Sequence, residues 1–563
     1  MSDYNHDQTI TAALSALGQG DVASATEHAR SASTARADDA ESWSVLGLCL
    51  ARDTAQSSAA REALIKATEM ESAEPRWWMH LGMSLLEMGD AMAAEAALAK
   101  AAELSNGHVQ VMMPWGKALM EAGRPADAAQ IYGRVLQSTQ SPELWLKAGE
   151  ALSAAGDTIN AVYAYEQAYN DETRPDGLTA AIADMHIMLG QYDRAAVFND
   201  HLRAKDANDP DAGMRAANLL RWAGDLSGAK VLQKEYWMNN PAHAPLTAAM
   251  LEDGDGSAKE AGLKIANDTA GEPAERRRAA FALTHYFDKM GDLDAAWTYA
   301  ALANSLYDSA PTGVDDMRVM LAKAVKAYQL MPDDDPQEPR LVYIIGPPRS
   351  GGSLLQTVLA RVPQSKSVGE RGALLSWLPK VLDKPGELAG MLDELRNADV
   401  AGMVKAAGAA DIFIDKTPHH VLVAGLLSKV HAGAVFVAPW RCRADMAVSL
   451  YFHEFGPEFA FARTLNGIAD YLDFHKEAVK QWREAGVNII DHDHDSFTQN
   501  PKETGAALCE ALNLPWSEAL LEDTDADSTV RTFSARQVRG GVSTKFSGRG
   551  ARYGKFLKER FAD

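Results

Sequence analysis

The sequence predicts two folds joined in one chain: an α-helical solenoid over residues 1–330 and an α/β domain with a parallel sheet over residues 341–563. Small and large residues recur at a fixed period in the first region, and short apolar runs alternate with helical patterns in the second. Residues 331–340, MPDDDPQEPR, are rich in proline and acid and break both patterns, so we expect a linker there. A chain of 563 residues is also too long for a single hydrophobic core.

The period of the first region is 34 residues in its clearest part. Two successive units align as Trp78 with Met112, Gly82 with Gly116, Gly89 with Gly123, and Ala94 with Ala128. Small residues let paired helices approach closely, and a glycine after each first helix ends it. This pattern resembles the tetratricopeptide repeat, whose stacked hairpins form a concave face for an extended peptide or a protein partner. A solenoid that only mediates self-association, as in a homo-oligomer, stays open as an alternative.

Charge and cysteine content narrow the class of protein. Residues 340–563 hold 27 basic and 27 acidic side chains, so the net charge of -22 lies entirely before them. An acidic front half repels nucleic acid and either attracts basic peptides or is a solvated surface. Cys49, Cys442 and Cys509 are too far apart for a disulfide framework. Neither a secretion signal nor a membrane span is expected, and we predict a cytoplasmic protein.

The second region alternates predicted strands with predicted helices. The strands lie at residues 341–345, 412–414, 434–438 and 487–490, and helical patterns cover residues 421–430 and 469–485. This alternation predicts a parallel sheet with helices on both faces. Ligands of such sheets bind at the carboxyl ends of the strands, so polar residues that directly follow a strand are the candidates for a site.

A phosphate-binding loop follows the first predicted strand. Residues 346–353, GPPRSGGS, fit the spacing GxxxxGK[ST] except that Gly352 stands at the lysine position, while Arg349 supplies a cation three residues earlier. A glycine turn leading into a helix N-terminus offers backbone N–H groups and a positive dipole end to a phosphate. The missing lysine argues against nucleoside-triphosphate hydrolysis, as in a kinase or a GTPase.

Further candidates follow the later strands. They are Asp415, Lys416 and His419 after the second, Arg441, Arg443 and Ser449 after the third, and Asp491–Asp495 after the fourth. Arg441 and Ser449 are placed so that both could reach one phosphate. Together with the loop they make two phosphate sites, which suggests a donor with phosphates at both ends. His492 and His494 would share a strand face, but no third spaced ligand supports a metal site.

These motifs resemble those of sulfotransferases that use 3′-phosphoadenosine 5′-phosphosulfate (PAPS). GPPRSGGSLL is similar to the 5′-phosphosulfate loop, IDKTP to the central segment, and FVAPWRCRADMAVSLYFHEF to the 3′-phosphate motif of that family. With repeats in front, the chain resembles bacterial tetratricopeptide-repeat sulfotransferases, which are similar to tyrosylprotein sulfotransferases. The resemblance spans about residues 341–557 and implies a P-loop-type sulfotransferase domain, adenosine 3′,5′-bisphosphate as the product and no metal.

The resemblance also assigns roles to residues. It places Arg349, Ser350, Gly351, Gly352 and Ser353 at the 5′-phosphosulfate, Arg441 and Ser449 at the 3′-phosphate, and Arg549 at the nucleotide phosphates. Its catalytic residues are Glu370 as the general base, Lys416 at the leaving oxygen, Ser534 at the reacting sulfate, and Arg349. Charge accumulates on the leaving phosphate during sulfuryl transfer, so converging cations are chemically sensible there.

Some positions depart from the family pattern. Gly352 and Ser353 replace the usual Thr-Thr pair, and Ala551 stands where many relatives have tryptophan. These departures keep a second hypothesis open, a scaffold whose sulfotransferase-like domain binds nucleotide but does not turn over. The acceptor also stays open: peptide tyrosine, a carbohydrate or a small-molecule hydroxyl all fit, with the solenoid docking the acceptor or a protein partner.

Overall fold

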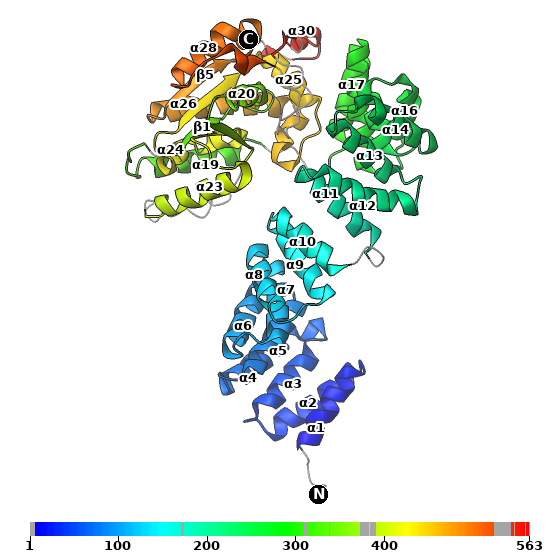
Figure 1. The fold of residues 1–563 in the computed structure, drawn as a ribbon. Helices are drawn as coiled ribbons and strands as arrows, with labels where there is room; N and C mark the ends of the chain where they lie inside the picture. Colours follow the sequence, from blue (N-terminus) through cyan, green and yellow to red (C-terminus); the bar gives the residue numbers. More distant parts are fainter. Residues whose placement is uncertain are drawn as a thin grey trace. The chain divides into compact units, whose positions relative to one another are not determined.

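The computed structural model describes residues 6–169, 174–308, 313–336, 338–371, 382, 390–522, 542–544, 547–557 and 559–561. The chain divides into two compact units, residues 1–239 and residues 240–563 (Figure 1). The first unit is helical throughout its described part. The second unit begins with further helices and continues into a domain built around a five-stranded sheet.

Paired helices form the first unit, as the repeat pattern predicted. They are α1 (His6–Gly18), α2 (Val22–Ala35), α3 (Ala40–Leu50), α4 (Ser57–Met70), α5 (Pro75–Glu87), α6 (Ala91–Leu104), α7 (Val109–Glu121), α8 (Pro125–Leu136), α9 (Pro142–Ala154), α10 (Thr158–Ala168), α11 (Asp176–Met188), α12 (Tyr192–Lys205), α13 (Pro210–Trp222) and α14 (Leu226–Asn239). Successive helices pack on one another, which is the arrangement of a tetratricopeptide solenoid.

The repeated glycines have two distinct packing roles. A Cβ at Gly82 would stand 2.4 Å from Leu98 Cγ, and one at Gly116 would stand 2.5 Å from Tyr132 Cε1. Glycine therefore makes room for a large side chain of the paired helix. Gly89, by contrast, has a φ of 79° and sits in the turn between α5 and α6, where a side chain would be strained.

The second unit starts with helices that the repeat pattern also covered. They are α15 (Ala244–Asp253), α16 (Lys259–Asn267), α17 (Pro273–Met290), α18 (Leu293–Ser305) and α19 (Asp315–Tyr328). The last of them, α19, packs against α24 (Ala424–Val430) and α26 (Leu465–Glu484) of the sheet domain. These helices are therefore built into the same compact unit as the sheet.

The sheet is parallel and has the strand order β2-β3-β1-β4-β5. Its strands are β1 (Arg340–Ile344), β2 (Ser365–Gly369), β3 (Ile412–Asp415), β4 (Val435–Trp440) and β5 (Ile489–Asp493). Leu341 pairs with Phe413, Val342 with Val435, and Phe436 with Ile489. The sequence patterns predicted four of these strands and missed β2, because SKSVG is polar and only half-buried at the sheet edge.

Helices cover both faces of the sheet (Figure 1). Under one face, α20 (Gly352–Leu359), α27 (His494–Gln499) and α28 (Pro501–Ala511) bury a core with Val342, Ile344 and Val437 of the strands. On the other face Tyr343 stacks on Phe436, with a ring-centroid distance of 5.1 Å. Helix α26 adds the buried Trp482, whose indole N–H donates to the Val421 carbonyl. All five carboxyl ends consequently meet at one edge between the two helical layers.

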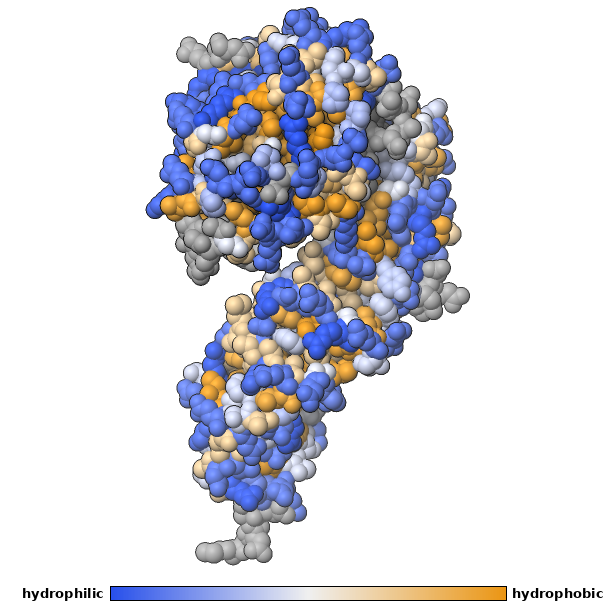
Figure 2. Space-filling view, turned by 60° about the vertical axis from the view of Figure 1, so that its left-hand side comes forward, coloured by the Kyte–Doolittle hydropathy of each residue, from blue (hydrophilic) through white to orange (hydrophobic). Residues whose placement is uncertain are grey.

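The surface is mostly hydrophilic on the side shown in Figure 2, with hydrophobic residues in smaller patches. Large hydrophobic side chains that are well exposed include Met92, Val197 and Val231. Among the helices that the structure describes, none is both long and apolar enough to cross a membrane.

Candidate functional site

The loop after β1 turns tightly into helix α20. Arg349 has a φ of 70° and Gly351 a φ of 98°, both in the left-handed region. A Cβ at Gly351 would stand 2.0 Å from His494 Nδ1, and one at Gly346 would stand 2.6 Å from the Pro439 carbonyl oxygen. Both positions therefore require glycine, because α27 and the end of β4 press against the loop. The loop is a preformed cradle that ends at the N-terminus of α20.

A histidine that the sequence patterns did not single out supports the start of this loop. His475 of α26 is buried, and its Nε2 lies 2.7 Å from the Ile345 carbonyl oxygen. A carbonyl only accepts, so Nε2 carries the proton and donates. Burial lowers the pKa of His475 to about 4, which keeps the ring neutral in this role. His475 thus fixes the backbone where β1 passes into the loop.

Two loop serines lie at the start of α20. Ser350 is 1% exposed, and among the described residues its Oγ has no hydrogen-bond partner. Ser353 is buried one residue into the helix. A buried hydroxyl without a partner is costly, and an anion bound in the loop would satisfy it.

Arginines from three segments surround the loop. Arg349 Nε donates to Ser449 Oγ of α25 (Arg443–Tyr451) at 2.8 Å, so the loop cation and the second predicted phosphate site are contiguous. Burial, together with the smaller effect of the charges of Arg549 and Arg441, lowers the pKa of Arg349 to about 9. Three guanidinium groups near one another form a site that favours an anion.

A buried carboxylate organises two of these arginines. Asp445 is 1% exposed, and its Oδ2 accepts from Arg441 Nη2 at 2.8 Å. The same carboxylate accepts from the backbone N–H groups of Gly548 at 2.8 Å and Gly550 at 2.5 Å. These bonds fix α30 (Arg549–Arg552) against the first turn of α25. Asp445 escaped the sequence prediction, although it lies only four residues from Arg441, just inside the helix that Arg441 precedes.

The predicted base and the predicted lysine meet at the ends of β2 and β3. Lys416 Nζ forms an ion pair with Glu370 Oε1, and Lys416 is 7% exposed. The Lys416 stem also reaches the phosphate loop, because its Cγ and Cδ lie 3.5 Å from where a Cβ on Gly352 would stand. The Lys416 stem therefore passes beside position 352, where the phosphate-loop spacing calls for a lysine.

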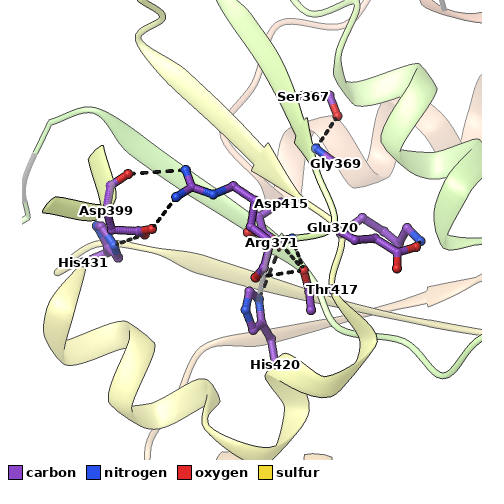
Figure 3. A network of polar contacts seen from close by, with 10 residues as sticks. Ser367, Gly369, Glu370, Arg371, Asp399, Asp415, Thr417, His420 and His431 are labelled. Atoms are coloured by element: carbon purple, nitrogen blue, oxygen red, sulfur yellow. Dashed lines mark hydrogen bonds and ion pairs between the residues drawn. The ribbon is translucent and has the colours of Figure 1, made fainter. Parts of the chain in front are cut away.

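A buried polar network lies next to the Glu370–Lys416 ion pair (Figure 3). Arg371, next to Glu370, donates through Nη2 to Asp399 Oδ1 at 3.0 Å, and His431 Nε2 lies 3.0 Å from Asp399 Oδ2. The Arg371 backbone N–H donates to Thr417 Oγ1 at 2.8 Å. The residue that follows Glu370 and the residue that follows Lys416 are thereby bonded to each other. Arg371 also connects them to α23 (Leu392–Ala407), which carries Asp399.

Asp415 lies at the centre of this network. Its Oδ1 accepts from Thr417 Oγ1 at 2.7 Å and lies 3.4 Å from His420 Nδ1. Burial raises the pKa of Asp415 to about 8 and lowers that of His420 to about 3. At neutral pH both groups are therefore mostly uncharged.

Most of the predicted site residues converge on the carboxyl edge of the sheet. Those that do are Arg349, Ser350, Gly351, Gly352, Ser353, Glu370, Lys416, Arg441, Ser449 and Arg549. Ser534 lies outside the described residues. His419 stacks on Phe459, with a centroid distance of 4.9 Å. Burial lowers the pKa of His419, and the charges of Glu458 and Glu370 oppose that shift. The edge thus brings clustered arginines, a lysine and a glutamate together.

Comparisons with known proteins match both regions of the chain. Residues 339–518 match the sulfotransferase family, and residues 50–108 and 85–149 match tetratricopeptide repeats. The chain is also 25% identical over 407 residues to an uncharacterized protein of Aquifex aeolicus (strain VF5), an alignment that covers 63% of this chain and 53% of that protein.

Solved structures that are similar to this chain include tetratricopeptide proteins. YrrB, described as a TPR protein with an unusual peptide-binding site, is 17% identical with a TM-score of 0.29 and covers 34% of this chain and 98% of its own. PilF of Pseudomonas aeruginosa is 18% identical with a TM-score of 0.29 and covers 37% of this chain and 94% of its own. By its family matches and its fold, the chain joins tetratricopeptide repeats to a domain of the sulfotransferase family.

Proposed function

We propose that this protein transfers a sulfuryl group from PAPS to an acceptor hydroxyl. The observation that carries the proposal is the position of Lys416, which lies against the phosphate loop at Gly352 and pairs with Glu370. A cation between a phosphate cradle and a carboxylate suits the transfer of a charged group from a phosphate to an acceptor.

The donor would occupy the arginine-rich side of the sheet edge. The loop N–H groups, Ser350 and Arg349 would hold the 5′-phosphosulfate. The buried Ser350 hydroxyl, which has no hydrogen-bond partner among the described residues, supports that placement. Arg441 and Ser449 would hold the 3′-phosphate, and Arg549 would approach the nucleotide phosphates from α30. Sulfate and phosphate esters carry their charge at neutral pH, so these contacts need no metal ion.

Lys416 and Glu370 would then have different roles in the reaction, one at the leaving group and the other at the acceptor. The acceptor oxygen forms a bond to sulfur while the bond from sulfur to the bridging phosphate oxygen breaks, and adenosine 3′,5′-bisphosphate leaves. Lys416 and Arg349 would stabilise the charge that develops on that oxygen. Glu370, whose side chain is 45% exposed, would take the proton of the acceptor hydroxyl.

The helical repeats would bring the acceptor or a protein partner. Their described helices form stacked hairpins, and such arrays commonly bind extended peptides. The acidic excess of residues 1–339 favours a partner with basic character. A peptide hydroxyl, including tyrosine, is thus one acceptor class, with carbohydrate and small-molecule hydroxyls as the others.

A second candidate function rests on the loop and α30. Gly352 provides no hydroxyl, and the exposed Ala551 offers no aromatic ring for a base to stack on. The domain would in that case bind the nucleotide without transferring sulfate.

Calorimetric titration of the full chain tests the donor site shared by both candidates. We expect adenosine 3′,5′-bisphosphate to bind in the presence of a chelator, and ATP with Mg²⁺ to bind far more weakly. Absence of nucleotide binding, or tighter binding of ATP with Mg²⁺, would contradict the assignment. Bound nucleotide with no sulfate transfer would favour the second candidate.

A further inference from the structure

Helices α17 and α18 contact the elements that carry the proposed phosphate site. Trp297 of α18 stacks on Phe556 with a centroid distance of 4.7 Å and an interplanar angle of 5°. Asn304 Nδ2 donates to the carbonyl of Tyr451, the last residue of α25, at 2.8 Å. The hairpin therefore packs on both α25 and the segment that follows α30, although its sequence is that of one more helical repeat.

Asp288, near the end of α17, contacts a residue of the proposed phosphate site directly. Its Oδ2 lies 2.8 Å from Arg549 Nη2, and its Oδ1 accepts from the Tyr553 hydroxyl at 2.7 Å. The side chains of Asp288 and Arg549 are only 17% and 14% exposed. Water screens such a pair poorly, so loss of one partner has a larger effect than at an exposed pair.

The remaining contacts hold Arg549 in one orientation. Its guanidinium lies over the Phe452 ring, 5.0 Å from the ring centroid. Asp445 binds the backbone N–H groups on both sides of it, those of Gly548 and Gly550. Arg549 Nε is buried and has no hydrogen-bond partner in the described part of the chain. The side chain is thus fixed, with a donor still to be satisfied.

Charge balance explains why an aspartate is needed at this place. The positive charges of Arg549 and Arg441 act on Arg349, so the three guanidinium groups repel one another. Asp445 neutralises Arg441 from one side, and Asp288 neutralises Arg549 from the other. The cluster can therefore assemble before a phosphate arrives, which lowers the cost of ordering it on binding.

We propose that Asp288 is a positioning residue of the donor site, which holds Arg549 toward the nucleotide phosphates and makes the α17–α18 hairpin a part of that site. The proposal rests on the proposed function, because it requires a nucleotide phosphate beside Arg549. By reciprocity, a bound nucleotide also strengthens the packing of this hairpin on α30.

The test measures the affinity of the full chain for adenosine 3′,5′-bisphosphate by calorimetry. Asp288→Asn keeps the size of the side chain and removes its charge, and we expect the affinity to fall about tenfold. Asp294→Asn is the matched control, because the exposed pair of Asp294 with Lys555 at 2.6 Å joins the same hairpin to the same segment. We expect its affinity to stay within about twofold of the parent.

A double-mutant cycle separates positioning from a purely structural role. We expect Asp288→Asn to have no further effect on affinity in an Arg549→Gln background, even where both changes lower the melting temperature. Parent-like or tighter binding by Asp288→Asn, or an undiminished effect in the Arg549→Gln background, would overturn the inference. Failure of the parent to bind the nucleotide would instead reject the proposed function.

Discussion

The two sides of the sheet edge differ in the side chains that gather there. The β2–β3 side buries the carboxyl groups of Asp399 and Asp415 behind Glu370, whereas the β1–β4 side gathers Arg349 and Arg441 around the loop. Lys416 stands between them and touches both. On the proposed function, the β2–β3 side would be a proton-accepting half and the β1–β4 side an anion-binding half, so substitutions on the two sides should affect different measured quantities.

The largest effect is expected from the pair at the boundary. Lys416→Ala and Glu370→Gln should each lower kcat for sulfate transfer about 100-fold or more, because each removes a group that acts in the transition state. Nucleotide affinity should change by less than about fivefold. Steady-state kinetics with a competent acceptor, together with calorimetry, measures both quantities.

Lys480→Ala is the control for the first of these variants, because Lys480 is an exposed lysine of α26 paired with Glu484. It should behave as the parent does. If Lys416→Ala and Glu370→Gln also transfer sulfate at the parent rate, the proton-accepting half has been assigned wrongly.

Substitutions in the anion-binding half should mainly lower nucleotide affinity. Arg349→Ala removes charge-assisted hydrogen bonds to the donor, each worth about 1.5–3 kcal/mol, so the affinity for adenosine 3′,5′-bisphosphate should fall about 10- to 100-fold. Arg483→Ala is the control, since Arg483 forms its ion pair with the exposed Asp491 away from the loop. Calorimetry that finds equal losses for the two variants would remove the distinction between the halves.

The buried acids predict how stability depends on pH. Asp415 has a folded pKa of about 8, above its ordinary value, so the folded state binds a proton that the unfolded state has released. Stability should therefore fall as pH rises from about 6.5 to 8, by roughly 1–2 kcal/mol. Asp415→Asn should remove this loss, as measured by urea unfolding at both pH values. Equal pH dependence in parent and variant would show that Asp415 is ionised in the fold.

The smallest effect concerns the unusual glycine of the loop. A Cβ at Gly352 would meet Ile344 Cγ2 at 3.4 Å and Lys416 at 3.5 Å, which are ordinary contacts. Gly352→Ser should therefore fold and add one hydroxyl beside the donor, strengthening nucleotide affinity about threefold. Gly352→Ala separates the hydroxyl from the added carbon. Weaker binding by the serine variant would mean that this position is closed to the donor.

The sequence predicted the helical repeats and most of the sheet because both produce patterns of apolar and small residues that are visible over short stretches of sequence. Gly82 lies where the Leu98 side chain of the paired helix packs against it. The apolar run at residues 341–345 corresponds to the central strand. Strand β2 has no such signal, since its residues are polar. It nevertheless places Glu370 beside Lys416, residues that are far apart in sequence and meet only through the pairing of β2 with β3.

Residues that support the site were largely beyond sequence reasoning. His475 binds the loop from a helix more than a hundred positions away, and Asp288 reaches Arg549 from a helix that looks like an ordinary repeat. Neither contact leaves a trace in spacing or composition, because tertiary packing alone brings the partners together. Asp445 is intermediate, since its pairing with Arg441 is local in sequence while its bonds to Gly548 and Gly550 are not.

Sulfuryl transfer from PAPS to an acceptor is tested most directly with radiolabelled sulfate. PAPS that carries the label is incubated with the full chain and an extract of its own cells, and the label is followed. We predict that label appears on an acceptor in equal amount to the adenosine 3′,5′-bisphosphate released, and that Lys416→Ala abolishes both. Donor that binds but stays intact at every acceptor concentration, with no label transferred, would contradict sulfuryl transfer as the function of this site.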